Sequence, residues 1–227
     1  MDTAYNNNVS GEREFGKSRP IFSDVGLVNL TGGFQVALAD VPAIADGYIP
    51  AGTPMQVDES TRTAKIFKAA KVFTATTPTT GDLTIDIEKE LDGVNGFGRN
   101  PLKVGDIIMV LGSTMTTAGL AVKITAIDRS ATTKDVLTVN DELIVVKGDF
   151  LVLASEESAS AAVPEVVPNC ITPYDIKKNE NATAVYADAC VGLLYGVVYE
   201  RRIPMLPNIV KQCLLDNGCN FVFSQSK

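Results

Sequence analysis

One acidic strand carries the residues with the clearest potential for chemistry. In "DLTIDIEKELDG", the carboxylates Asp82, Asp86, Glu88 and Glu90 alternate with apolar residues, so an extended strand would line them along one face. Such a row suits a glycosidase-like pair or a calcium site. A half-buried antiparallel strand shows the same polar-out alternation. We favour this structural interpretation, because no companion residues of a substrate cleft accompany the acids, and keep a hydrolase built on Asp86 and Glu88 as an alternative.

The sequence contains no histidine. Without it, the chain cannot form a Ser-His-Asp or Cys-His arrangement, a histidine general base, or a histidine-ligated metal site. The segment "GVNGFGRN" spaces Gly93, Gly96 and Gly98 in the reverse order of the GxGxxG nucleotide loop, and no helical pattern follows it. We predict an ordinary loop there.

The four cysteines Cys170, Cys190, Cys213 and Cys219 match no CxxC metal or redox spacing. We expect Cys190 to be a small buried hydrophobe and Cys213 to face inward from a helix. A Cys213–Cys219 disulfide is an open alternative that a reducing cytosol disfavours. The prediction is therefore a chain with no metal, no cofactor and no enzymatic activity.

Length and charge narrow the classes of partner. The chain has 227 residues, 45% of them hydrophobic, and a net charge of −7, which is enough for one large or two small domains. Its 20 Lys and Arg are scattered, so nucleic acid is not an expected partner. No apolar run reaches the length of a membrane span, and the first residues lack a secretory pattern. We expect a soluble protein made in a cytoplasm.

The apolar pattern predicts a mainly β protein. From Val25, short apolar runs recur every 8 to 12 residues, as in a small β-sandwich or barrel. A second β-rich, barrel-like block follows "TTPTTGD" and contains "KVGD" and "VKGD", two Gly-Asp turns that each open into an apolar run. In each turn, the glycine allows positive φ and the aspartate can bond the backbone.

The chain therefore divides into an extended N-terminal arm, a first β-domain, an inserted second β-domain and a linker. The ranges expected for them are, respectively, 1–24, 25–72 plus 170–227, 73–154 and 155–169. One helix is predicted, in "LPNIVKQCLLDNGCNFVF", starting at Pro207 or Asn208 and stopped by Gly218 in the left-handed conformation before a last strand.

The tight turn in "GYIPAGTPMQVD" is predicted to shape the first domain and to do no chemistry. Pro50 fixes φ, Gly52 permits a conformation that other residues resist, and Pro54 keeps Thr53 extended. If Gly52 has positive φ, a Gly52→Val change is expected to destabilise the fold.

Two segments together resemble the head decoration proteins of tailed bacteriophages. The turn "GYIPAGTPMQVD" is similar to their "paGT" corner, and "GVVYERRIPMLPNIVKQCLLDNGCNFVF" is similar to the end of capsid-stabilising and head-fibre-base proteins. The resemblance covers about 40–72 and 183–223. The family's compact members lack an equivalent of 73–154, and their arms are shorter.

The resemblance implies a non-enzymatic auxiliary capsid protein on the outer surface of the virion, assembled in the host cytoplasm. Implied partners are the major capsid protein, further copies of the chain, including a trimer, and head-fibre proteins. The polar arm would lie across capsid subunits and add a strand to an exposed edge. Its expected contact residues are three apolar anchors and three cations: Phe15, Ile21, Phe22, Arg13, Lys17 and Arg19. A merely disordered terminus is the alternative.

One further function is open from the sequence. The block 73–154 is also consistent with the binding head of a head-fibre or adhesin-like module that takes a glycan or receptor. A shallow aromatic platform would favour this, but the chain has no Trp, and the block offers only Phe73, Phe97 and Phe150.

Overall fold

The computed structural model describes residues 26–37, 48–77, 81–89, 101–177 and 186–224. The protein is mainly β, as the sequence predicts, and its chain forms two compact units. Unit 1 contains residues 1–66, 92–99 and 168–227, and unit 2 contains 67–91 and 100–167. Unit 2 is thus inserted in the sequence of unit 1. The arm at 1–24, with all six of its expected contact residues, lies outside the described residues, as do Glu90 and the loop glycines Gly93, Gly96 and Gly98.

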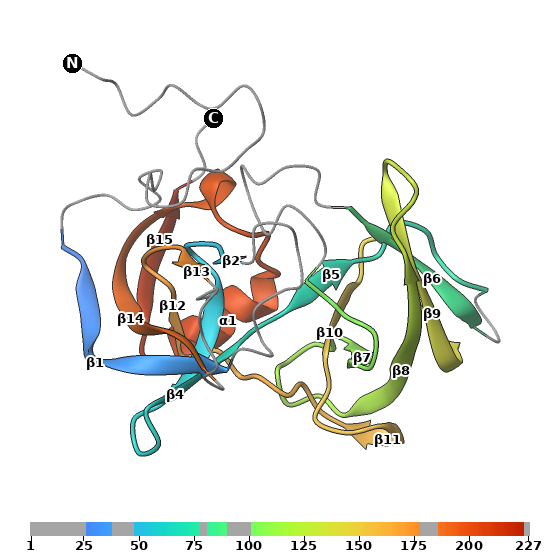
Figure 1. The fold of residues 1–227 in the computed structure, drawn as a ribbon, viewed down its shortest axis with the longest axis horizontal. Coiled ribbons are helices and arrows are strands. Elements are labelled where there is room, and N and C mark those ends of the chain that lie inside the picture. Colours follow the sequence, from blue (N-terminus) through green and yellow to red (C-terminus); the bar gives the residue numbers. More distant parts are fainter. Residues whose placement is uncertain (1–25, 38–47, 78–80, 90–100, 178–185, 225–227) are drawn as a thin grey trace. The chain divides into compact units, whose positions relative to one another are not determined.

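Five strands of unit 1 close into a ring. In the order β1-β4-β3-β12-β14, the last strand pairs back onto β1, and β15 lies on β14 (Figure 1). A separate pair joins β2 to β13. The bounds are β1 Val28–Ala37, β2 Tyr48–Ile49, β3 Pro54–Asp58, β4 Thr63–Ile66, β12 Cys170–Ile171, β13 Ile176–Lys177, β14 Tyr186–Tyr199 and β15 Asn220–Ser224.

The core of unit 1 follows from strand alternation. Phe34 and Val36 on β1 and Met55 on β3 have no exposed surface, and their side chains meet those of Ile66 and Cys190 in one apolar cluster. Polar residues between them, such as Gln35, face solvent. The period of two therefore places one face of each strand in the core.

The end of the chain forms a strand–helix–strand unit. The 3₁₀ helix η2 (Glu200–Arg202) and the helix α1 (Asn208–Asp216) connect β14 to the parallel strand β15. Pro207 caps the start of α1, and Gly218 ends it with φ +86°. The N–H of Cys219 donates to Leu214 O and that of Gly218 to Leu215 O, the two bonds of a Schellman motif. The helix prediction is confirmed at both ends.

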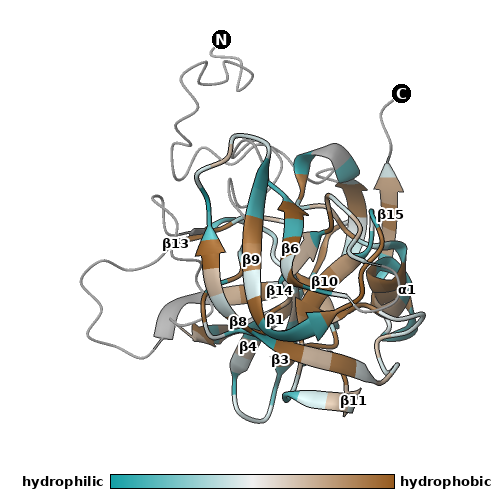
Figure 2. Ribbon diagram, turned by 90° about the vertical axis from the view of Figure 1, so that its right-hand side faces the viewer, coloured by the Kyte–Doolittle hydropathy of each residue, from teal (hydrophilic) through white to brown (hydrophobic). Residues whose placement is uncertain are grey.

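Unit 2 is a second closed ring, of six strands. In the order β5-β10-β7-β8-β9-β6, the antiparallel bridge Val72–Ile87 joins β6 back to the end of β5. Apolar and polar bands follow one another along β9 (Figure 2), and apolar side chains from all six strands fill the core. The bounds are β5 Ala69–Lys71, β6 Asp82–Glu88, β7 Ile107–Val110, β8 Gly119–Asp128, β9 Lys134–Leu143, β10 Phe150–Leu153 and β11 Ser158–Ala162.

Two sequence-based boundaries are wrong. The predicted linker 155–169 contains β11, which pairs with β8, and Ala154 bridges Pro164. Its small, acidic composition is typical of a linker, but β8 supplies the backbone partners that make it a strand. Residues 67–72, expected in the first domain, belong to unit 2, because β5 pairs with β10 and Val72 bridges Ile87.

The predicted alternation of β6 fails at its start. Ile85 and Ile87 are buried, but Leu83 is 50% exposed. The pairing of β6 with β9 shifts register between Asp82 and Thr84, so Leu83 leaves the inward row. Among the described residues, no helix is long and apolar enough to span a membrane.

The two Gly-Asp turns have the same structure, as the sequence predicts. Gly105 and Gly148 have φ of +96° and +94°. In each turn the aspartate carboxylate accepts a hydrogen bond from the backbone N–H three residues earlier, at 3.0 Å for Asp106 and 2.8 Å for Asp149. Each turn leads directly into β7 or β10, which are neighbours in the ring.

These turns generate the first prediction. A Cβ added at Gly105 or Gly148 meets no atom within 4 Å, so alanine there introduces only backbone strain. Gly105→Ala and Gly148→Ala should each lower the free energy of unfolding by about 1–2 kcal/mol, measured by chemical denaturation. The control is Gly119→Ala, a strand glycine without positive φ, for which no loss is expected. Equal effects at all three positions would contradict the account.

Candidate functional site

The turn from Pro50 to Thr53 is buried and held by several hydrogen bonds. The N–H of Thr53 donates to Pro50 O at 3.3 Å, and Gly52 has φ +82°. Positive φ at the third residue is the requirement of a type II turn, which glycine meets without strain. The conformation expected at Gly52 is therefore confirmed. Pro54 begins β3 and lies opposite Ile171 of β12.

Thr172, which follows β12, fastens this turn. Its carbonyl accepts from the N–H of Gly52 at 2.7 Å, and its N–H donates to Thr53 O at 2.9 Å. The hydroxyls of Thr172 and Thr53 both donate to Pro50 O, at 3.0 and 2.6 Å. Both threonines have no exposed surface. Every polar group of the turn named here is thus satisfied inside the protein, as burial requires.

Gly52 also lies directly against Ile203, in the link between η2 and α1. A Cβ built on Gly52 would come 2.6 Å from Ile203 Cβ and closer still to its Cγ2. Position 52 therefore excludes any side chain on two counts, backbone conformation and space. The turn shapes unit 1 and offers no exposed group for chemistry.

Two acids of β6, Asp86 and Glu88, form ion pairs with lysines on neighbouring strands. Asp86 lies 2.6 Å from Lys134 Nζ on β9, and Glu88 lies 2.8 Å from Lys71 Nζ on β5. Asp82 accepts hydrogen bonds at 3.0 Å from the N–H and the hydroxyl of Thr77. Each of Asp86 and Glu88 therefore has its own lysine partner, in a cross-strand ion pair of the ring.

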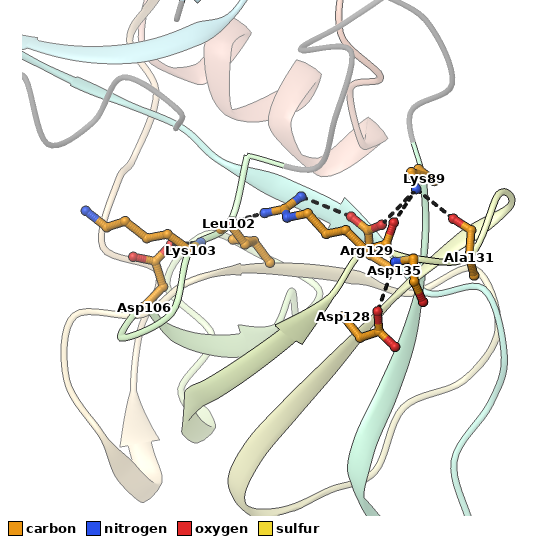
Figure 3. Close-up of polar contacts among 9 residues, drawn as sticks. Lys89, Leu102, Lys103, Asp106, Asp128, Arg129, Ala131 and Asp135 are labelled. Atoms are coloured by element: carbon orange, nitrogen blue, oxygen red, sulfur yellow. Dashed lines mark hydrogen bonds and ion pairs between the residues drawn. The ribbon is translucent and has the colours of Figure 1, made fainter. Parts of the chain in front are cut away.

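The structure reveals a buried charge cluster in unit 2 that sequence reasoning missed (Figure 3). Asp135 has no exposed surface, and its Oδ2 accepts a hydrogen bond from Arg129 at 3.0 Å. Lys89 Nζ lies 3.7 Å from Asp135 Oδ1 and donates to the carbonyls of Arg129 and Ala131 at 2.8 and 2.6 Å. A second Arg129 nitrogen donates to Leu102 O at 2.8 Å.

This cluster ties the β8–β9 hairpin to neighbouring segments. Its carboxylate is enclosed, so a substrate has no access to it. The sequence pattern could have predicted this burial. Asp135, Leu137 and Val139 alternate along β9 and lie in the same inward row. An acid in an inward row needs a cation partner.

All four cysteines are buried free thiols. Burial raises the pKa of the Cys190 and Cys219 thiols to about 11, and it raises the pKa of Cys170 and Cys213 as well. At neutral pH the thiols are therefore uncharged and poor nucleophiles. The expectations that Cys190 is a buried hydrophobe and that Cys213 faces inward are confirmed.

The Gly52–Ile203 contact generates a prediction. Gly52→Ala should lower the free energy of unfolding by about 3 kcal/mol or more, since strain and overpacking add. In an Ile203→Ala background the same change should cost only about 1–2 kcal/mol, the strain alone. The measurement is a double-mutant cycle by chemical denaturation. An identical cost in both backgrounds would show that the contact is unimportant.

The charge cluster of Asp135, Arg129 and Lys89 generates another prediction. Arg129→Met leaves Asp135 with a weaker set of partners in a buried position and should cost about 3 kcal/mol of unfolding free energy. Lys134→Met removes the partly exposed partner of Asp86 and should cost at most about 1 kcal/mol. Thermal and denaturant unfolding of the two variants distinguishes them. If both variants lost equally little unfolding free energy, the fold would not need Arg129 as the partner of Asp135.

In the described part of the chain, the polar groups of the Pro50–Thr53 turn, the acids of β6 and Asp135 all form contacts within the fold. Among them, no three His, Cys, Asp or Glu side chains are arranged to hold a metal ion. No protein-family model, no curated protein and no solved structure matches the chain.

Proposed function

We propose that the chain is a structural virion protein that binds the outer surface of an icosahedral phage capsid and stabilises it. The observation that carries the proposal is the contact between Gly52 and Ile203. These residues belong to the two sequence segments that resemble head decoration proteins, about 150 residues apart in the chain. Their close approach supports treating the segments as parts of one domain rather than as separate coincidences.

The chemistry of the described residues supports a binding rather than an enzymatic role. Asp86 and Glu88 are neutralised by lysines on adjacent strands, and Asp135 is enclosed. Both units are closed rings of strands, and closure removes most free edges and stiffens a domain. Rigidity suits a protein that clamps a shell under pressure from packaged DNA. The net charge of −7 suits a component that must not adhere to that DNA.

In this proposal the main partner is the major capsid protein, contacted by the N-terminal arm. The arm would pair its backbone with an exposed strand edge on the shell, with the apolar side chains in pockets and the cations on capsid carboxylates. The protein would assemble on the shell in the host cytoplasm. A head fibre is a further partner consistent with the resemblance.

One observation favours a second candidate, a glycan- or receptor-binding role for unit 2. Leu83, Ile144 and Val146, near the paired ends of β6 and β9, are 50%, 47% and 61% exposed. Exposed apolar groups close together mark interaction sites. The half-buried Phe73 nearby, with Lys147 Nζ 5.8 Å from its ring centre, would supply the aromatic contact.

Removing the arm tests the proposed function. Deleting residues 1–22 should weaken co-sedimentation with empty expanded heads, made from the capsid protein of the same genome, by about tenfold or more. The melting temperature should not change. Replacing Asn6, Asn7 and Asn8 by alanine alters the same arm without touching an anchor and should leave binding intact. Full affinity of the deleted protein would refute the arm contact. If the intact protein does not bind the heads, the receptor-binding candidate is favoured instead.

A further inference from the structure

The last strand of unit 1 is an edge strand without the usual protection. Within the described part of the chain, β15 is paired with β14 alone. Natural edge strands commonly carry a charged residue, a proline or a bulge that prevents pairing with another chain. The sequence of β15, Asn-Phe-Val-Phe-Ser, has none of these. Its residues have high strand propensity and no charge.

The two faces of β15 differ. Phe221 is buried, and Phe223 lies beside α1, with Lys211 Nζ 5.3 Å from its ring centre. Val222 points to the other face and is 58% exposed. On that face it lies opposite Val197 of β14, two residues from Tyr195, which is 43% exposed. On the same face, the Arg202 guanidinium lies 4.9 Å from the ring centre of Tyr199, which pairs with Ser224. The open edge therefore borders a partly apolar surface that has a cation near one end.

The strand is complementary to a second copy of itself. In an antiparallel pair centred on Val222, Val222 lies opposite its own counterpart, Phe221 opposite Phe223, and Asn220 opposite Ser224. Each pair is on one face of the sheet, and the pairs are aliphatic, aromatic and polar, which are favourable cross-strand combinations. No like charges meet. A pair of identical antiparallel strands has two-fold symmetry, so the contact closes after two copies.

We propose that β15 is a dimerisation edge, at which a second copy of this chain pairs antiparallel about Val222 and extends the sheet of unit 1. The inference does not depend on the proposed function. Each copy carries a net charge of −7, so mutual repulsion opposes the dimer at low salt. Raising the salt from about 50 to about 500 mM screens this repulsion and strengthens an uncharged contact.

Sedimentation equilibrium of the full chain tests the proposal. The wild-type protein should show a monomer–dimer equilibrium whose dissociation constant falls with added salt. Val222→Lys places two ammonium groups opposite each other and should weaken the dimer by about tenfold or more. Leu215→Lys, a matched change at an exposed apolar position on α1 (44% exposed), should not.

A mixing experiment separates pairing from any effect on folding. Val222→Lys and Val222→Glu should each be monomeric alone, and an equal mixture should form a heterodimer because opposite charges then meet at the axis. A purely monomeric or trimeric wild-type protein would overturn the proposal. An unchanged dissociation constant for Val222→Lys would also overturn it, as would an equal weakening of the dimer by Leu215→Lys. A mixture of Val222→Lys and Val222→Glu that stays monomeric would overturn it too.

Discussion

The packing of unit 1 depends on the missing side chain at Gly52. The turn that contains it is bonded to Thr172, and its empty position receives Ile203. Three segments far apart in sequence thereby meet at one buried point: the entry to β3, the residue after β12 and the link to α1. Because the groups involved have no exposed surface, each bond forms in a low dielectric and must be complete. This combination of close packing and satisfied polar groups holds the ring of strands to its C-terminal helix.

In unit 2, ion pairs hold distant segments together. Its ring closes through the Val72–Ile87 bridge, and the adjacent hairpin is held by Asp135, Arg129 and Lys89. Replacing a buried ion pair by apolar residues of similar volume is often neutral or stabilising, whereas removing one partner is strongly destabilising. The two Gly-Asp turns, one before β7 and one before β10, start neighbouring strands with the same local geometry. Both units thus rely on tertiary contacts at specific residues rather than on helix or strand propensity alone.

The features predictable from sequence are those set by local chemistry. Glycine and aspartate define the 103–106 and 146–149 turns, and Pro207 and Gly218 bracket α1, because each residue acts on its own backbone. The features missed depend on distant partners. The strand at 158–162 exists because β8 lies beside it, and Asp135 is buried because Arg129 and Lys89 reach it. Among the predicted site residues, the structure describes the turn residues Pro50, Gly52 and Pro54. The arm residues lie outside the described part of the chain.

The central claim is that the chain binds a phage shell at defined positions. Its most direct test is the saturation stoichiometry of the intact protein on empty expanded heads assembled from the capsid protein of the same genome. The account predicts saturable binding at one fixed ratio to capsid subunits, and that ratio identifies the symmetry site. Binding that does not saturate, or no binding to the heads, would contradict it.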